Sequence, residues 1–255
     1  MLGSSPHARL ICVKLRRMPP HYLQPLLAPK SVALVGATER EGALGAIVWR
    51  NLAAGGLRGE LTPLNPKHRA VFGQRAYDRL TDLPRPPDLA VIVTPARAVE
   101  SVITDAAAAG VKAAVILTSG FGETGAAGRA LQASVLAAAR RGGVRILGPN
   151  CLGLMRTDTG LNATFARTPA RAGNLALVSQ SGAICGAILD WAASAEVGFT
   201  SVVSLGGAID VDFGEVLDFL VADEATDAIL MYVEGVRDAR RYVSALRAAA
   251  RSADT

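Results

Sequence analysis

A glycine-rich turn near the start of the chain is the first feature with chemical potential. Gly36, Gly42 and Gly45 stand between an apolar run at 31–35 and a stretch of helical composition at 45–54. The free backbone N–H groups and the dipole at the start of such a helix favour a phosphate. The spacing is not that of the G-x-G-x-x-G fingerprint, so the support for a dinucleotide is weak.

The residue type at the end of the next strand indicates which nucleotide the glycine-rich turn would bind. NAD sites place an acidic residue there to hold the ribose hydroxyls. This sequence has Asn65, Pro66 and Lys67 instead, and no acidic residue until Asp78. A cation at this tip suits an extra phosphate, as on coenzyme A (CoA) or NADP. A solvated loop lysine is the simpler alternative.

A second turn with chemical potential reads Ser179-Gln180-Ser181-Gly182. It joins an expected strand at 175–178 to an expected helix at 183–193, whose free amides would make an anion site. Ser181 also suits the plainer role of a helix N-cap. Further along, Glu234 ends an apolar strand, where a carboxylate is costly unless it has a partner.

The elements that must position these turns form a repeating α/β pattern. Short β-branched runs alternate with Ala-rich stretches, which predicts βαβ units on a parallel sheet. All five strands expected in the first half end in small, polar or Pro-Gly segments. Ligands bind beyond the carboxyl ends of such strands, so the tips should line one crevice. The expected strands are 31–35, 60–64, 89–93, 113–117 and 144–147, with helices at 45–54, 98–109 and 127–140.

The pattern divides the chain into a Rossmann-like domain at 24–151 and a second α/β domain at 174–255. The residues at 152–173 break the pattern and are interpreted as a linker. The second domain should hold strands at 175–178, 201–205 and 228–233 and helices at 183–193, 213–221 and 238–251. Because its last helix has no following strand, we expect a partial flavodoxin-like domain, C-terminally incomplete.

Composition and charge narrow the function classes. Half of the 255 residues are apolar and 19% are charged, which is typical of a globular protein. The net charge of +5 comes from the basic extension at 1–23 and Lys30, since the first 30 residues hold five Lys or Arg and no acidic residue. The remaining body is neutral, which argues against nucleic-acid binding.

The cysteines and the hydropathy of the sequence predict the cellular compartment of the protein. Cys12, Cys151 and Cys185 are too few and too scattered for a disulfide framework or a metal site such as zinc, so we expect a reducing cytoplasm. No run approaches the ~20 apolar residues of a membrane helix, so no membrane association is expected.

Six segments carry a family resemblance: SVALVGAT, PLNPK, VIVTPA, TSGFGE, GPNCLGLM and LVSQSGA, in this order and at matching separations. They resemble the CoA-binding and succinyl-CoA ligase-like domains of NDP-forming (ADP-forming) acyl-CoA synthetases, over about residues 24–252. GLNATFA, SQSGAICGAILDWA and the DAR after Glu234 resemble the branch fused to a lysine acetyltransferase domain.

The resemblance implies a reaction in which a carboxylic acid, CoA and ATP give acyl-CoA, ADP and phosphate, through an acyl phosphate and a phosphohistidine. It also implies residue roles. The CoA phosphates would be held by Gly36, Ala37 and Thr38, with Asn65 and the counter-charge Lys67. The nucleotide or pantetheine channel would be lined by Val93, Thr94 and Pro95. The thiol end of CoA would lie near Ser119, Gly120, Asn150 and Cys151.

In the second domain, the resemblance implies that Ser179, Ser181 and Gly182 hold the phosphoryl group. The catalytic Glu234 would steady the phosphohistidine, with a simple strand-end acid as the alternative. Cys151 is interpreted as a small buried neighbour and not a nucleophile, because no His or Lys stands ready to activate it.

The sequence departs from the family in several places. The phosphorylated histidine lies beyond the next strand, and the three histidines here are His7, His21 and His68. No stretch of these 255 residues resembles the family's ATP-grasp domain, which would bind ATP or ADP and Mg. The loop after 201–205 reads Gly206-Gly207-Ala208-Ile209 where the family has Gly-Asn, so its role is open.

Three functions remain open at this stage. The chain could be part of a synthetase that uses a small carboxylic acid and an ATP-grasp subunit in trans, or a stand-alone CoA-binding regulatory module. An NADP-binding oxidoreductase is weaker, since no catalytic Tyr-Lys pair is evident. An unfinished sheet would expose an edge strand and apolar faces, so we expect an oligomer or a partner.

Overall fold

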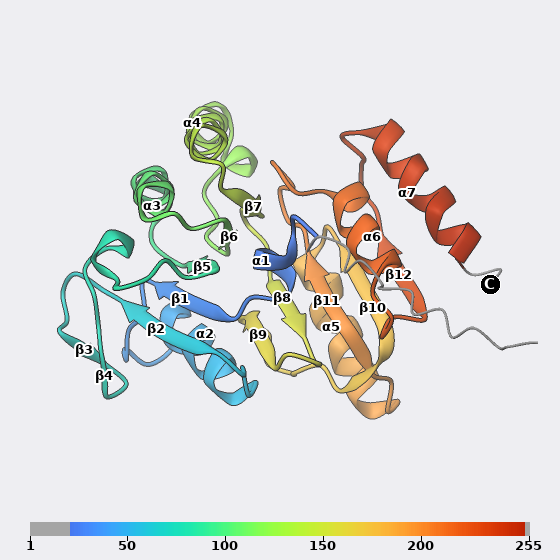
Figure 1. Ribbon diagram of the computed structural model, residues 1–255, viewed down its shortest axis with the longest axis horizontal. Helices are drawn as coiled ribbons and strands as arrows, with labels where there is room; N and C mark the ends of the chain where they lie inside the picture. Colours follow the sequence, from blue (N-terminus) through green and yellow to red (C-terminus); the bar gives the residue numbers. More distant parts are fainter. Residues whose placement is uncertain (1–20, 253–255) are drawn as a thin grey trace, which may run out of the picture.

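The computed structural model describes residues 21–252, so most of the basic extension expected at 1–23 lies outside the described residues. Figure 1 shows two α/β units side by side, each built around its own sheet. The α/β fold class expected from the sequence is confirmed, with a parallel Rossmann-like sheet followed by a flavodoxin-like sheet.

The first sheet has the order β2-β1-β5-β6-β7, and all four neighbouring pairs are parallel. Its central strands are apolar and buried along their whole length, as strands covered on both faces must be. The strands are β1 Ser31–Val35, β2 Glu60–Leu64, β5 Leu89–Ile92, β6 Ala113–Ile116 and β7 Arg145–Leu147.

Helices cover both faces of this sheet. Alternate side chains of β1 point to opposite sides: Leu34 packs in one cluster with α2, and Ala33 packs in another with α3 and α4. Figure 1 accordingly shows α2 on one side of the sheet and α3 and α4 on the other. The bounds are α1 Gln24–Leu27, α2 Leu44–Ala54, α3 Ala96–Ala109 and α4 Ala126–Gly142.

The second sheet corrects the expectation of a linker at 152–173. That segment supplies two buried antiparallel strands, β8 Gly153–Arg156 and β9 Leu161–Thr164. They complete a five-stranded sheet of order β12-β10-β11-β8-β9, where three strands were expected. The sequence hides them because they lack a β-branched run and contain Arg156, whose charge is paired inside the fold with Asp158 and Asp223 at 2.7 and 2.9 Å.

The remaining elements follow the expected order. The other strands of the second sheet are β10 Ala172–Ser179, β11 Phe199–Ser204 and β12 Ala228–Tyr232, and the helices are α5 Gly182–Ser194, α6 Phe213–Val221 and α7 Ala239–Ser252. As an edge strand, β12 leaves Leu230 and Tyr232 exposed. A small hairpin of β3 Ala70–Val71 and β4 Gln74–Arg75, and the short helices η1 Leu80–Asp82 and η2 Gly122–Thr124, were not expected.

A stretch after β11 joins the two sheets, and we call residues 206–211 the junction segment. It runs antiparallel to the end of β7 and donates three backbone hydrogen bonds to it. These run from Gly207 to Pro149 at 2.8 Å, from Ile209 to Gly148 at 3.2 Å and from Val211 to Ile146 at 3.1 Å. The otherwise open edge of the first sheet is therefore covered by the second unit.

Residues 21–252 hold neither a membrane-spanning helix nor a metal-binding cluster. None of the helices there is both long and apolar enough to span a membrane. In the same part of the chain, no group of three or more His, Cys, Asp or Glu side chains is arranged to hold a metal ion.

Candidate functional site

The glycine-rich turn after β1 is built by close backbone approach. Gly36 has φ of +98°, and a Cβ added there would lie 3.0 Å from Cγ2 of Val93. A Cβ on Gly45 would lie 2.2 Å from the Gly36 carbonyl oxygen. Both positions therefore require glycine. The N-cap of α2, Ala43, makes no side-chain hydrogen bond to the first turn, so N–H groups there remain for a ligand.

The loop after β2 is bonded directly to this turn. The Asn65 side-chain amide donates to the Ala37 carbonyl oxygen at 2.8 Å, and its own oxygen accepts the Lys67 N–H at 2.9 Å. The N–H groups of Gly36 and Ala37 both donate to the Leu64 carbonyl oxygen. The structure thus brings together Gly36, Ala37, Asn65 and Lys67, and leaves the Lys67 side chain exposed at the rim.

The loop after β5 contributes an unsatisfied polar group. The hydroxyl Oγ1 of Thr94 is buried and has no hydrogen-bond partner among the described residues. Its carbonyl oxygen accepts the Thr118 hydroxyl at 2.7 Å, which fastens this loop to the one after β6. A buried hydroxyl without a partner costs about 1–3 kcal/mol.

The loops after β6 and β7 meet at the far side of the crevice. The Asn150 N–H donates to the Thr118 carbonyl oxygen at 3.0 Å, and both Ser119 and Asn150 are exposed. Gly120 has φ of +106° and donates its N–H to the Glu123 carboxylate at 2.6 Å. The predicted thiol-end residues therefore share one edge of the sheet with the glycine-rich turn.

Cys151 differs from its neighbours because it is only 2% exposed. Its thiol donates to the Ile116 carbonyl oxygen at 3.4 Å, and burial raises its pKa to about 12. A thiol with this pKa stays protonated at neutral pH and is a poor nucleophile. The interpretation of Cys151 as a buried neighbour agrees with this environment.

The turn Ser179-Gln180-Ser181-Gly182 in the second unit, which we call the serine turn, uses its two serines in different ways. Ser179 is fully buried, and its hydroxyl accepts the Ser181 N–H at 3.0 Å and donates to the Ser181 carbonyl oxygen at 2.9 Å. Ser181 caps α5 by accepting the Ile184 N–H at 3.3 Å. Gly182 starts the helix against Leu152, where an added Cβ would lie 3.3 Å from Cβ of that leucine. Ser179 therefore shapes the turn, and an anion would meet Ser181 and the helix N–H groups.

Glu234 is exposed beside the edge strand β12, so its carboxylate carries no burial cost that a partner would have to offset. Its backbone is nevertheless fixed near the serine turn. The side-chain oxygen of Gln180 accepts the N–H groups of Glu234 at 2.6 Å and Gly235 at 2.9 Å. Gln180 is a residue that the sequence reasoning missed, although its place between the two serines was a signal.

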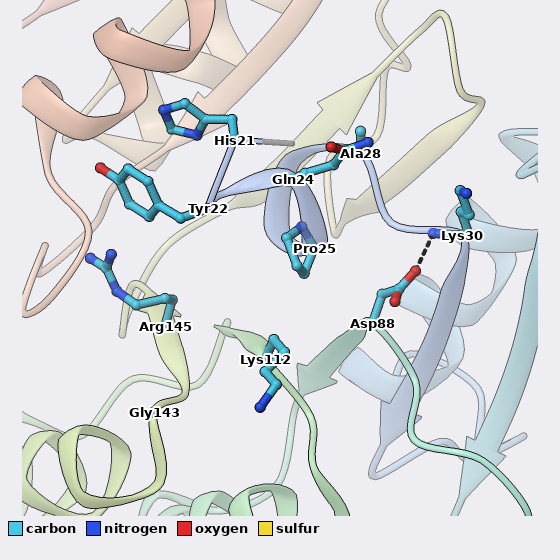
Figure 2. A pocket seen from close by; sticks show the side chains of 10 residues that line it. All are labelled: His21, Tyr22, Gln24, Pro25, Ala28, Lys30, Asp88, Lys112, Gly143 and Arg145. Atoms are coloured by element: carbon cyan, nitrogen blue, oxygen red, sulfur yellow. Dashed lines mark hydrogen bonds between the residues drawn. The ribbon is translucent and has the colours of Figure 1, made fainter. Parts of the chain in front are cut away.

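A cavity of about 600 Å³ lies at the opposite edge of the first sheet, where the strands begin. It is lined by residues 21–28 and by the starts of β1, β6 and β7, and by none of the predicted site residues. Figure 2 shows Lys30 and Lys112 extending in different directions, while Arg145 approaches the Tyr22 ring. These cations do not converge on one point, so the crevice at the carboxyl edge remains the candidate site.

Two family models match the chain. The model described as a CoA binding domain matches residues 30–157, and that of a succinyl-CoA ligase like flavodoxin domain matches residues 172–254. The chain therefore belongs to the CoA-binding-domain family, and a succinyl-CoA ligase-like flavodoxin domain follows that domain on its C-terminal side.

Curated relatives agree with this assignment. The chain is 38% identical over 229 residues to acetate–CoA ligase [ADP-forming] I of Archaeoglobus fulgidus, covering 90% of this chain and 33% of that protein. It is 40% identical over 225 residues to the alpha subunit of acetate–CoA ligase [ADP-forming] I of Pyrococcus furiosus, covering 87% and 49%. The chain thus spans a third to a half of the length of these relatives.

A solved structure has the same fold. The dinucleotide forming acetyl-coenzyme A synthetase 1 of Ca. Korarchaeum cryptofilum, in complex with phosphate and ADP, superposes with a TM-score of 0.85 at 36% identity. The superposition covers 89% of this chain and 49% of that one.

Proposed function

We propose that this chain binds CoA in the crevice at the carboxyl edge of the first sheet, as the CoA-binding part of an ADP-forming acyl-CoA synthetase. The observation that carries the proposal is the bonding of the loops after β1 and β2. Asn65 holds Ala37 at 2.8 Å, next to free N–H groups at the start of α2 and the exposed cation Lys67. This combination suits a ligand with several phosphates.

The second unit extends the proposal to the phosphoryl group. Ser181 and the first N–H groups of α5 form an anion site, with Gly182 allowing close approach and Glu234 exposed nearby. In the proposed reaction, a small carboxylic acid, CoA and ATP give acyl-CoA, ADP and phosphate. ATP and Mg would bind an ATP-grasp subunit or domain that acts with this chain.

Three finer parts of the proposal each rest on a further feature of the chain. The GLNATFA segment, part of it in β9, supports placement in the branch fused to a lysine acetyltransferase domain. The exposed edge of β12 supports association with a partner or a second copy. The scattered free cysteines support the cytoplasm as the compartment.

Isothermal titration of the purified chain with CoA, dephospho-CoA and NADP tests the proposal. We expect CoA to bind more tightly than dephospho-CoA, because the 3′-phosphate adds a charge at the rim beside Lys67. NADP should bind weakly or not at all. Absence of CoA binding would reject the proposal, and tight NADP binding would favour the oxidoreductase alternative.

A further inference from the structure

The junction segment 206–211 lies between the two turns that the proposed function uses. Immediately before this segment, the Leu205 N–H donates to the Ser179 carbonyl oxygen at 2.8 Å. Two residues later, the Gly207 N–H donates to the Pro149 carbonyl oxygen at 2.8 Å. One short backbone stretch therefore touches both the serine turn and the loop that carries Asn150.

Gly206 makes this contact sterically demanding. It has φ of +53°, and a Cβ added there would lie 2.5 Å from the carbonyl oxygens of both Pro149 and Asn150. Each oxygen belongs to backbone, so a larger residue would force the Asn150 loop away from the serine turn. Gly207 differs, because a Cβ there would lie 3.3 Å from the Pro149 oxygen at the nearest.

The other end of the junction segment is anchored by charge. Asp210 accepts the Arg145 Nε at 2.8 Å and the Ile146 N–H at 2.9 Å. Arg145 also bonds both carboxylate oxygens of Glu215 on α6, at 2.7 and 2.9 Å. Glu215 is only 5% exposed, so this pairing ties the second unit firmly to β7.

The loop after β12 also contacts the junction segment. The Arg237 side chain donates to the Ala208 carbonyl oxygen, and Arg237 lies in the loop that begins with Glu234. Leu205 and the junction segment that follows it thus contact the serine turn, the predicted thiol end of the CoA site and the Glu234 loop.

We propose that the junction segment couples CoA binding in the first unit to phosphate binding at the serine turn in the second, with Gly206 as the positioning residue. This inference rests on the proposed function. In that reaction the CoA thiol must meet an acyl phosphate, and a misplacement of about 1 Å can cost on the order of 100-fold in rate. Gly206 sets that placement by letting the two backbones touch.

The test is titration of the full chain with CoA in the absence and in the presence of excess inorganic phosphate. Coupled sites typically change each other's affinity by about 5- to 150-fold. We expect phosphate to change the CoA dissociation constant of the wild-type chain by about fivefold or more. In Gly206→Ala that effect should fall below about twofold, because the added methyl group displaces the Asn150 loop from the serine turn.

Gly207→Ala is the matched control, since it adds the same methyl group one residue away with a milder backbone contact, 3.3 Å in place of 2.5 Å. It should keep the wild-type phosphate effect. Thermal unfolding of both variants separates coupling from stability, because a merely structural role would lower Gly206→Ala stability and leave coupling intact. CoA binding without any phosphate effect in the wild-type chain would overturn this inference alone. Absence of CoA binding would overturn the proposed function and this inference with it.

Discussion

The two ends of the first sheet use their polar groups in opposite ways. At the carboxyl end, helices α2 and α3 begin, their N-caps make no side-chain hydrogen bonds, and the Thr94 hydroxyl has no partner among the described residues. At the amino end, α3 and α4 finish in the left-handed residues Gly110 and Gly143. Carbonyl groups and the negative ends of helix dipoles face that side.

This difference explains the cations around the amino-end cavity. Arg145 pairs with Asp210 at 2.8 Å and with Glu215 at 2.7 Å. Arg140 and Arg141 stand in the last turn of α4, where they complement the dipole. Positive charge at the amino end therefore stabilises the fold, whereas at the carboxyl end it remains for a ligand.

The largest effect should follow from removing the central cation of the amino end. Arg145→Gln would leave Asp210 without its ionic partner and Glu215 with Arg241 alone, at 3.0 Å. Breaking a buried pair typically costs about 3–5 kcal/mol, so we expect the free energy of unfolding in urea to fall by about that amount.

The matched control is Arg171→Gln, because the Arg171–Glu196 pair is 3.3 Å long and its side chains are 58% and 80% exposed. Its removal should cost less than about 1 kcal/mol. Equal losses in the two variants would mean that the partly buried pairing of Arg145 stabilises the fold no more than an exposed ion pair does.

The next effect concerns the carboxyl end. Gly36→Ala places a methyl group 3.0 Å from Val93 at φ of +98°, which should distort the turn that meets the CoA phosphates. We expect CoA affinity to fall at least about tenfold, equal to about 1.4 kcal/mol, in isothermal titration.

Gly42→Ala separates backbone strain from the loss of close approach. Gly42 has φ of +71°, but a Cβ there meets no atom within 4 Å. The variant should lose some stability and keep CoA affinity within about threefold of wild type. A similar loss of affinity in both variants would mean that the close contact at Gly36 is not what the ligand requires.

A smaller effect should follow at the rim. Lys67→Gln removes an exposed cation, so the preference for CoA over dephospho-CoA should shrink by about fivefold at most, which is the range of exposed ion pairs. The preference of the wild-type chain should also weaken with added salt. Lys112→Gln, at the amino end, is the control and should leave the preference unchanged. An equal effect of both would remove the distinction between the two ends.

The carboxyl end could be predicted from the sequence because its signals are local. Each strand of the first sheet is a short apolar run, and the residues that follow it define the turn. Parallel pairing then places Gly36, Asn65, Thr94 and Asn150 on one edge without further information. Their mutual bonds, such as that from Asn65 to Ala37, follow from that placement.

The amino end and the second unit could not be predicted in this way. Arg145 and Glu215 are 70 residues apart, and nothing local marks them as partners. The strands β8 and β9 lack a β-branched run, so their segment reads as a linker. Glu234 follows an apolar strand, but β12 lies at an edge of the sheet, and apolar character alone does not distinguish an edge from a centre.

The smallest effect concerns two buried thiols, Cys151 in the loop after β7 and Cys185 in α5. Burial raises the pKa of Cys151 to about 12 and that of Cys185 to about 11, against an ordinary value of 9.0. In the unfolded chain both thiols begin to lose protons near pH 9, while the folded chain keeps them. The stabilisation that comes from keeping these two thiols protonated is therefore fully present below pH 9 and declines as the pH rises toward about 11. At pH 9 the loss is about 0.4 kcal/mol per thiol.

Urea unfolding at pH 7 and pH 9, in a Cys12→Ser background, measures this loss. The variant with Cys151→Ala and Cys185→Ala should lose less stability than its parent over the same interval, because it has no thiol to deprotonate. In the folded parent, neither thiol should react with a disulfide reagent at pH 8, since the reactive thiolate is suppressed. Rapid reaction of Cys151 would instead show that the thiol end of the crevice opens to solvent. Cys151 would then be a candidate reactive residue and not a packing residue.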